Sequence, residues 1–299
     1  MKRLLLLPFA LLLTQCSPDP PGDSSVSVRG IAPTVNYSGS SHQIINVSAY
    51  DPKERHRSGS GYSEYDLTAL KSNGARGLIA RAGKGGNLDE KCASFIASAD
   101  RAGMLAGIYY RVQKHESPES QAEQFVSRAK SLSSRRPAGV VPLLLCGDYD
   151  GDLSLSQILR FMDRVEARTG VVPITYLENS QALKLQTRSA DSSTRARLLR
   201  APYWIALYSH ESGKGAIFPA PETPEGLVKQ YGLWSNWTLW QYGGVEWANR
   251  RSNPKVYSHG SYRNSLYFGK MDRPLERNLF RGSYQSLVGF WSRHGLAGN

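Results

Sequence analysis

Short apolar stretches alternate with amphipathic stretches of helical period over nearly half of this sequence. The apolar stretches lie at 44–49, 77–82, 105–111, 140–146 and 172–176, and the helical ones at 66–71, 90–101, 118–132, 155–168 and around Gln181. Strands this apolar, separated by helices, predict a parallel sheet that is covered on both faces. Five such units favour a closed (β/α) barrel over an open sheet.

The pattern changes after Ala201. Aromatic strands are predicted at 203–208 and 237–242, with long loops rich in glycine and proline between them, and a closing helix at 284–294. The sequence therefore predicts an α/β protein whose barrel, spanning 43–299, is an irregular TIM-like (β/α) barrel that is poor in helices in its last third.

The first 42 residues differ in composition from the rest. Lys2 and Arg3 precede ten apolar residues, too few for a permanent membrane span, so we expect 1–16 to be an export signal. Cys16 ends a segment with the layout of a lipoprotein cleavage box, although Gln15 is bulkier than the usual residue there. Lipidation of Cys16 at the cell envelope and plain secretion both stay open. Residues 17–42 are rich in Ser, Pro and Gly and are typical of a flexible tether.

The net charge of +12 and the pI of 9.6 suit an anionic polymer or a membrane surface. Nucleic acid is not expected behind an export signal, which leaves peptidoglycan, teichoic acid and acidic lipid as partners of a monomer. Cys92 and Cys146 are predicted to be buried thiols and not a disulfide. No histidine pairing suggests a metal site, and no cofactor is expected.

The run from Val140 to Asp152 is apolar until it ends in three carboxylates, Asp148, Asp150 and Asp152. Chemistry in (β/α) barrels takes place at the carboxyl ends of the strands. Asp148 and Asp150 share one face of an extended chain, about 7 Å apart. Nearby carboxylates have their proton affinities pushed apart, which provides the acid and the base that glycoside hydrolysis needs.

These acids also resemble two other kinds of segment. Asp152 or Ser154 is well placed to cap the next helix, so the acids could form a solvated turn. The spacing also resembles the start of a calcium-binding loop, but Leu153 and Leu159 stand where that loop needs Gly and Glu. The capping interpretation stays open, and the calcium loop is rejected.

Aromatic side chains gather at the predicted strand ends. Any one of these rings fits a core as well as a binding surface, but together with polar and glycine neighbours they suit a groove that stacks on sugars. The rings are Tyr109, Tyr110, Tyr176, Tyr203, Trp204, Tyr208, Trp234, Trp237, Trp240 and Tyr242.

The order of several segments resembles glycoside hydrolase family 25, the secreted lysozymes. Ile45-Asn46-Val47-Ser48 is similar to the family's opening Asp-Val-Ser strand, and Tyr109-Tyr110 to its Tyr-His step. The segment from Glu276 to Phe280 resembles a terminal Val-Asp-x-Asn-x-Phe. Further similar segments lie at 77–85, 121–125, 161–170, 173–176, 203–208 and 237–242.

The sequence departs from the family's pattern at the acidic positions. Asn46 and Glu276 replace two aspartates, and Asp148-Tyr149-Asp150 is the candidate for the central Asp-x-Glu. In the family this pair follows the strand's proline by three and five residues. Counting from Pro142 gives Leu145 and Gly147, which cannot transfer a proton, so Asp148 and Asp150 require a strand that runs three residues longer.

The resemblance implies a hydrolase of the β-1,4 bond after N-acetylmuramic acid in peptidoglycan. Asp150 would be the general acid and Asp148 the carboxylate that orients or stabilises the reacting group. The remaining candidates would bind substrate: Asn46, Tyr109, Tyr176, Trp204, Tyr208, Trp240, Gln241 and Glu276. The alternative is a degenerate barrel that binds glycan without cutting it, as a lipoprotein of the cell envelope.

Overall fold

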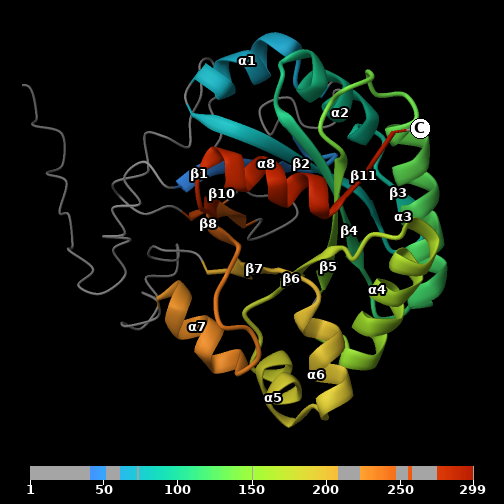
Figure 1. The fold of residues 1–299 in the computed structure, drawn as a ribbon, viewed down its shortest axis with the longest axis vertical. Coiled ribbons are helices and arrows are strands. Elements are labelled where there is room, and N and C mark those ends of the chain that lie inside the picture. Colours follow the sequence, from blue (N-terminus) through green and yellow to red (C-terminus); the bar gives the residue numbers. More distant parts are fainter. Residues whose placement is uncertain are drawn as a thin grey trace, which may run out of the picture.

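The computed structural model describes residues 41–51, 61–72, 74–149, 151–207, 223–246, 255–257 and 275–298. Within them, eight strands follow one another in the order β1-β10-β8-β7-β6-β5-β4-β2, and β1 pairs with β2 to close the ring. The predicted (β/α) barrel is confirmed (Figure 1). The strands are β1 Ser41–Val47, β2 Ala75–Lys84, β4 Leu105–Val112, β5 Leu143–Tyr149, β6 Ile174–Leu177, β7 Tyr203–Ala206, β8 Leu239–Glu246 and β10 Glu276–Arg281.

One strand departs from the predicted parallel arrangement. β10 runs antiparallel to both of its neighbours, β1 and β8, whereas the other barrel pairs are parallel. Because β10 is reversed, its first residue lies at the end where the parallel strands finish. Glu276 therefore pairs in register with Asn46 near the end of β1.

The helices begin and end where local signals predict. Ser154 and Gln157 form a capping box at the start of α4 (Leu155–Thr169), which stops at Gly170 with φ of 72°. Ser117 caps α3, and Pro118 is its first residue. The other predicted helices are α1 Glu64–Ser72, α2 Cys92–Arg101, α5 Gln181–Ser189 and α8 Tyr284–Arg293.

Two helices were not predicted. α6 (Ser192–Leu199) follows Asp191, whose side chain caps it, and α7 (Pro224–Tyr231) lies in a stretch that we expected to be loop. The signals for α7 are present, because Thr223 caps it, Pro224 opens it and Gly232 ends it with φ of 63°. The short strands β3 Asn87–Leu88, β9 Lys255–Tyr257 and β11 Gly295–Leu296 were also not predicted.

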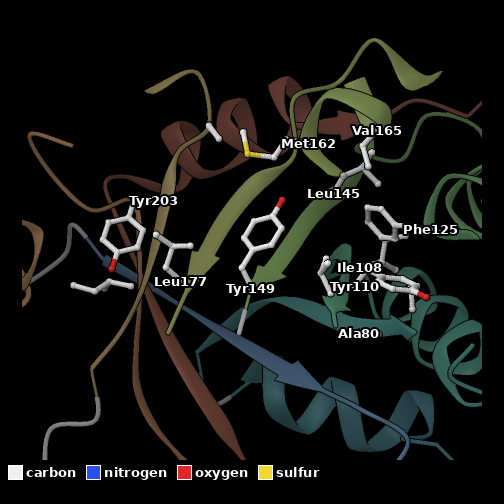
Figure 2. Packing of buried hydrophobic residues seen from close by; sticks show 14 of the residues in the cluster. Ala80, Ile108, Tyr110, Phe125, Leu145, Tyr149, Met162, Val165, Leu177 and Tyr203 are labelled. Atoms are coloured by element: carbon white, nitrogen blue, oxygen red, sulfur yellow. The ribbon is translucent and has the colours of Figure 1, made fainter. Parts of the chain in front are cut away.

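Alternate residues of each strand face two separate cores. The outer core packs the sheet against the surrounding helices, and Figure 2 shows Leu145 and Tyr149 of β5 there with Met162 and Val165 of α4. The inner core fills the barrel and includes Ile44, Ile79, Leu144, Ile174 and Leu239. Cys92 and Cys146 are buried free thiols, as predicted.

Helix α8, drawn in red in Figure 1, closes the amino-terminal end of the barrel. Its Trp291 is fully buried, and the indole Nε1 donates a hydrogen bond to the carbonyl oxygen of Ala106 at 2.6 Å. A Cβ atom at Gly77 would lie 3.0 Å from this indole, so the glycine makes room for it. The opposite end of the barrel is therefore the one open to a ligand. Over the described residues, no helix has the length and apolar character needed to cross a membrane.

Candidate active site

A ring of polar side chains occupies the open end of the barrel, which we call the mouth. Each of these residues has the inward orientation of its strand, above the apolar inner core. On each of these strands, the inward-facing residues change from apolar in the barrel interior to polar at the mouth. The ring consists of Asn46, Arg81, Tyr109, Asp148, Tyr176, Gln241 and Glu276.

Strand β5 runs three residues beyond its predicted end at Cys146, to Tyr149. Leu144 and Cys146 belong to the inner core, so Asp148 continues on the inward side at the mouth. Leu145 is fully buried in the outer core, and Gly147 alternates with the inward residues as Leu145 does. The count from Pro142 therefore leads to positions outside the mouth. Asp150 lies outside the described residues.

The floor of the mouth is a network of amide hydrogen bonds that joins β1, β8 and β10. Asn46 Nδ2 donates to Glu276 Oε2, and Gln241 Nε2 donates to the same carboxylate oxygen at 3.3 Å and to Asn46 Oδ1 at 3.2 Å. Asn278 Nδ2 donates to Asn46 Oδ1 at 2.8 Å and to the carbonyl oxygen of Ile44 at 3.1 Å. Asn46, Gln241 and Asn278 are all buried, so the network fixes the position of Glu276.

Two aromatic residues extend this network across the barrel. The Tyr176 hydroxyl donates to Gln241 Oε1 at 2.8 Å, and Trp204 Nε1 donates to Asn278 Oδ1 at 2.8 Å. The two rings meet edge to face, with centroids 5.0 Å apart. Because Trp204 is buried beneath Tyr176, it supports the floor, whereas the partly exposed Tyr176 can meet a ligand.

Tyr109 lies where the charges of the mouth converge. Burial raises the pKa of its hydroxyl well above the usual value, and the carboxylates of Glu276, Asp148 and Asp51 raise it further, whereas Arg81 lowers it. A charge shifts a neighbouring pKa in this way only when the two groups are close together and poorly screened by solvent. Asp51 in the turn after β1, Asp148 in β5 and Glu276 in β10 therefore all influence this one hydroxyl.

A second ionic group lies beside Asp148. Arg111 is its partner in the β4–β5 register, and Arg111 Nη2 is 3.6 Å from Glu178 Oε1. Glu178 Oε2 also accepts a hydrogen bond from the backbone N–H of Gly151 at 3.0 Å. We did not predict Arg81, Arg111, Glu178 or Asp51 as site residues. The two arginines could have been identified from the sequence, because the alternation along β2 and β4 puts Arg81 and Arg111 at inward positions.

The prediction that Trp240 lines the groove is wrong. Adjacent residues of a strand point to opposite faces, so Gln241 and Trp240 cannot both face the mouth. Trp240 is 1% exposed in the outer core, and its Nε1 donates to the carbonyl oxygen of Leu207 at 2.8 Å. Tyr208, the other candidate in this region, lies outside the described residues.

The other acidic and aromatic candidates have structural contacts. Ser154 caps α4, while the exposed Asp152 carboxylate lies 3.9 Å from Lys114 Nζ, so the capping interpretation holds for Ser154. Four further rings pack in the outer core: Tyr110, Tyr203, Trp234 and Trp237. Among the described residues, no three His, Cys, Asp or Glu side chains are grouped as a metal site.

Comparison with known proteins places this fold among lysozymes. A bacterial lysozyme from Streptomyces coelicolor superposes with a TM-score of 0.55 at 21% identity, covering 85% of this chain and 98% of that one. A muramidase from Acremonium alcalophilum gives 0.53 at 17% identity, covering 84% and 99%. A family GH25 lysozyme from Aspergillus fumigatus gives 0.52 at 18% identity, covering 84% and 99%. A search of curated proteins found no match.

At these identities the structural likenesses show a shared fold, and membership rests on the sequence. The family model described as glycosyl hydrolases family 25 matches residues 55–249, which is more than half of the chain. The chain belongs to glycosyl hydrolases family 25.

Proposed function

We propose that this protein hydrolyses peptidoglycan at the β-1,4 bond after N-acetylmuramic acid. The family and the lysozyme and muramidase folds support this substrate. One observation carries the chemistry: Asp148 and Glu276, distant in sequence, both lie on the inward side of the barrel at the mouth, Asp148 in β5 and Glu276 at the start of β10. Two carboxylates that flank one site are what glycoside hydrolysis needs.

The surroundings of the carboxylates suggest how they divide the work. Two amide N–H groups, from Asn46 and Gln241, point at Glu276, and such donors stabilise the charged form of a carboxylate. We assign Glu276 to holding the sugar and stabilising the positive charge that develops on its anomeric carbon. Asp150 protonates the leaving oxygen, and Asp148 orients the reacting group or water. Arg111, the partner of Asp148 in the β4–β5 register, adds a positive charge on this side of the mouth.

The same proposal puts the protein outside the cytoplasm, with 1–16 as the export signal. A lipid on Cys16 would anchor it, and the 17–42 tether would connect this anchor to a monomeric barrel. β1 is the first strand of the described barrel, and it starts at the amino-terminal end, which α8 closes. A tether that enters there joins the barrel at the end opposite the mouth, so it does not block access of glycan to the site. Cys16→Ser followed by membrane fractionation tests the anchor: release of the protein is expected, and unchanged membrane retention would contradict it.

Zymography on purified cell wall tests the activity. The wild type should clear the wall, whereas Asp148→Asn, Asp150→Asn and Glu276→Gln should each lower the rate, by about 100- to 10,000-fold for a proton-transfer group. The exposed Asp152 provides a matched control, because Asp152→Asn removes an acid of the same segment whose carboxylate faces Lys114 at the surface. Binding of the wild type to sacculi without new reducing ends would instead favour the non-cutting barrel.

A further inference from the structure

A cavity of about 310 Å³ lies next to the mouth, between the turn that follows β1 and the β2–β3 hairpin. We call it the Tyr50 hollow. Its walls include Tyr50, Arg81, Lys84, Asn87, Leu88 and Glu90. This volume is at the lower end of the range of ligand pockets, roughly 300 to 1,000 Å³. Arg81 belongs both to the hollow and to the ring of the mouth, so the two spaces share a wall.

The ring of Tyr50 is exposed, yet its surroundings are fixed. Tyr50 is 45% exposed, and the guanidinium of Arg81 lies over its ring, 5.4 Å from the centroid. Arg81 is held in turn by Asp89, whose Oδ2 accepts from Arg81 Nε at 2.7 Å. The same Asp89 oxygen accepts from the backbone N–H of Ala49 at 3.1 Å. The buried Asp89 carboxylate thus positions both the Arg81 guanidinium that lies over the ring and the backbone at Ala49, next to Tyr50.

Further hydrogen bonds hold the turn that carries Tyr50. Asp51 Oδ2 accepts from the backbone N–H of Ser48 at 2.8 Å, and the Asp51 N–H donates to the Ser48 carbonyl oxygen at 2.8 Å. The buried Lys91 Nζ donates to the carbonyl oxygen of Asp51 at 3.1 Å. An aromatic ring that is exposed and held in place loses little conformational entropy when a ligand stacks on it.

The chemistry of the walls fits a neutral sugar ring. Tyr50 and Leu88 offer apolar surface, and Leu88 is exposed like Tyr50. The polar part of the wall combines the neutral amide of Asn87, the cationic donor Lys84 and the anionic acceptor Glu90. Such a mixture suits hydroxyl and acetamido groups better than a single ionic group. We propose that the Tyr50 hollow is an outlying saccharide subsite, in which Tyr50 stacks on a sugar of the same glycan strand that enters the mouth. This inference rests on the proposed function.

Glycan strands of two lengths test the subsite, using strands freed of peptide and containing four or eight sugars. Binding is measured by calorimetry in an Asp148→Asn background, which prevents cutting. We expect Tyr50→Ala to weaken binding of the eight-sugar strand about tenfold and to leave the four-sugar strand unchanged. Tyr50→Phe keeps the ring and should bind like its parent. Tyr65, an exposed tyrosine of α1 (88%), provides the control variant Tyr65→Ala.

Two results would overturn the subsite: unchanged binding of the long strand by Tyr50→Ala, or equal weakening for both lengths. Cell-wall zymography of the wild type separates this failure from that of the proposed function. Clearing of the wall together with Tyr50-independent binding removes only the subsite. Binding that depends on Tyr50 without any clearing keeps the subsite and removes the hydrolase. If the parent neither binds glycan nor clears the wall, both proposals fail.

Discussion

The two ends of the barrel are built from the same strands but differ in chemistry. At the closed end, Ile44, Ile79 and Leu144 pack with α8 around the fully buried Trp291. At the mouth, the next inward residues along the strands include Asn46, Arg81 and other groups able to donate or accept protons and hydrogen bonds. One step of inward alternation, two residues, is enough to pass from an apolar layer to a polar one.

The difference shows how a barrel separates stability from chemistry. Apolar burial at the closed end contributes folding free energy without demanding hydrogen-bond partners. Buried polar groups at the mouth need complete networks, and the amides around Glu276 provide one. Substitutions at the two ends should therefore have opposite signatures, with loss of stability at one end and loss of activity at the other.

The largest expected effect is at the closed end. Trp291→Ala removes a fully buried indole and its hydrogen bond to Ala106, and should lower the free energy of unfolding by about 3–5 kcal/mol. Urea denaturation measures the loss, with Ser292→Ala on the exposed side of α8 as the control. The activity of the molecules that remain folded should hardly change. A stable variant that has lost activity would contradict the division between the ends.

Asp148→Asn tests the opposite signature at the mouth. The rate of wall hydrolysis should fall about 100-fold, because Asp148 orients the reacting group, while the free energy of unfolding changes by less than about 1 kcal/mol because the residue is partly exposed. Asp152→Asn is the paired control for both measurements. If Asp148→Asn unfolded as readily as Trp291→Ala, Asp148 would be a structural residue.

Asn278→Ala tests the boundary between the two ends. The change leaves Trp204 Nε1 without its acceptor and takes a donor from Ile44 and Asn46, so it should cost about 1–3 kcal/mol of stability. It should also lower activity, because the network that holds Glu276 is opened. Asn179→Ala, at an exposed turn, is the control. Full activity per folded molecule would show that the floor does not position Glu276.

The smallest effect concerns pH at the closed end. Burial lowers the pKa of His294, whose Nδ1 lies 3.0 Å from the carbonyl oxygen of Val172, and nearby Arg293 lowers it further, although the Val172 carbonyl opposes this. Below the ordinary pKa of about 6.5, the unfolded chain takes up a proton that the folded chain resists. This contribution to stability is complete above that pH and decreases as the pH falls through the lowered pKa.

Unfolding free energies measured in urea at several pH values between 5 and 8 would test this sign, since His294→Gln should remove part of the slope. The exposed His115 provides the control variant His115→Gln. A slope that His294→Gln leaves intact would assign the pH dependence to other groups.

Sequence periodicity was sufficient for most of the fold but not for the direction of every strand. The apolar runs of β2 and β4 and the amphipathic stretches of α3 and α4 lie close to the predicted ranges, because burial dictates those patterns locally. The reversal of β10 was not predictable in this way, since an antiparallel strand can carry the same inward alternation as a parallel one. The extension of β5 to Tyr149 likewise depends on its neighbours β4 and β6, with which Tyr149 pairs.

Sequence alone determined that the chain forms a (β/α) barrel, that an acidic segment follows its fourth predicted strand, and which residue types could carry chemistry. Only the tertiary structure decided which of them meet. Asn46 and Glu276 are 230 residues apart and join because β10 runs back along β1. Trp240 and Gln241 are neighbours in sequence, yet the pleat of β8 sends one to the outer core and the other to the mouth. The physical reason is that composition and periodicity are local, whereas a site is formed by the closure of the sheet.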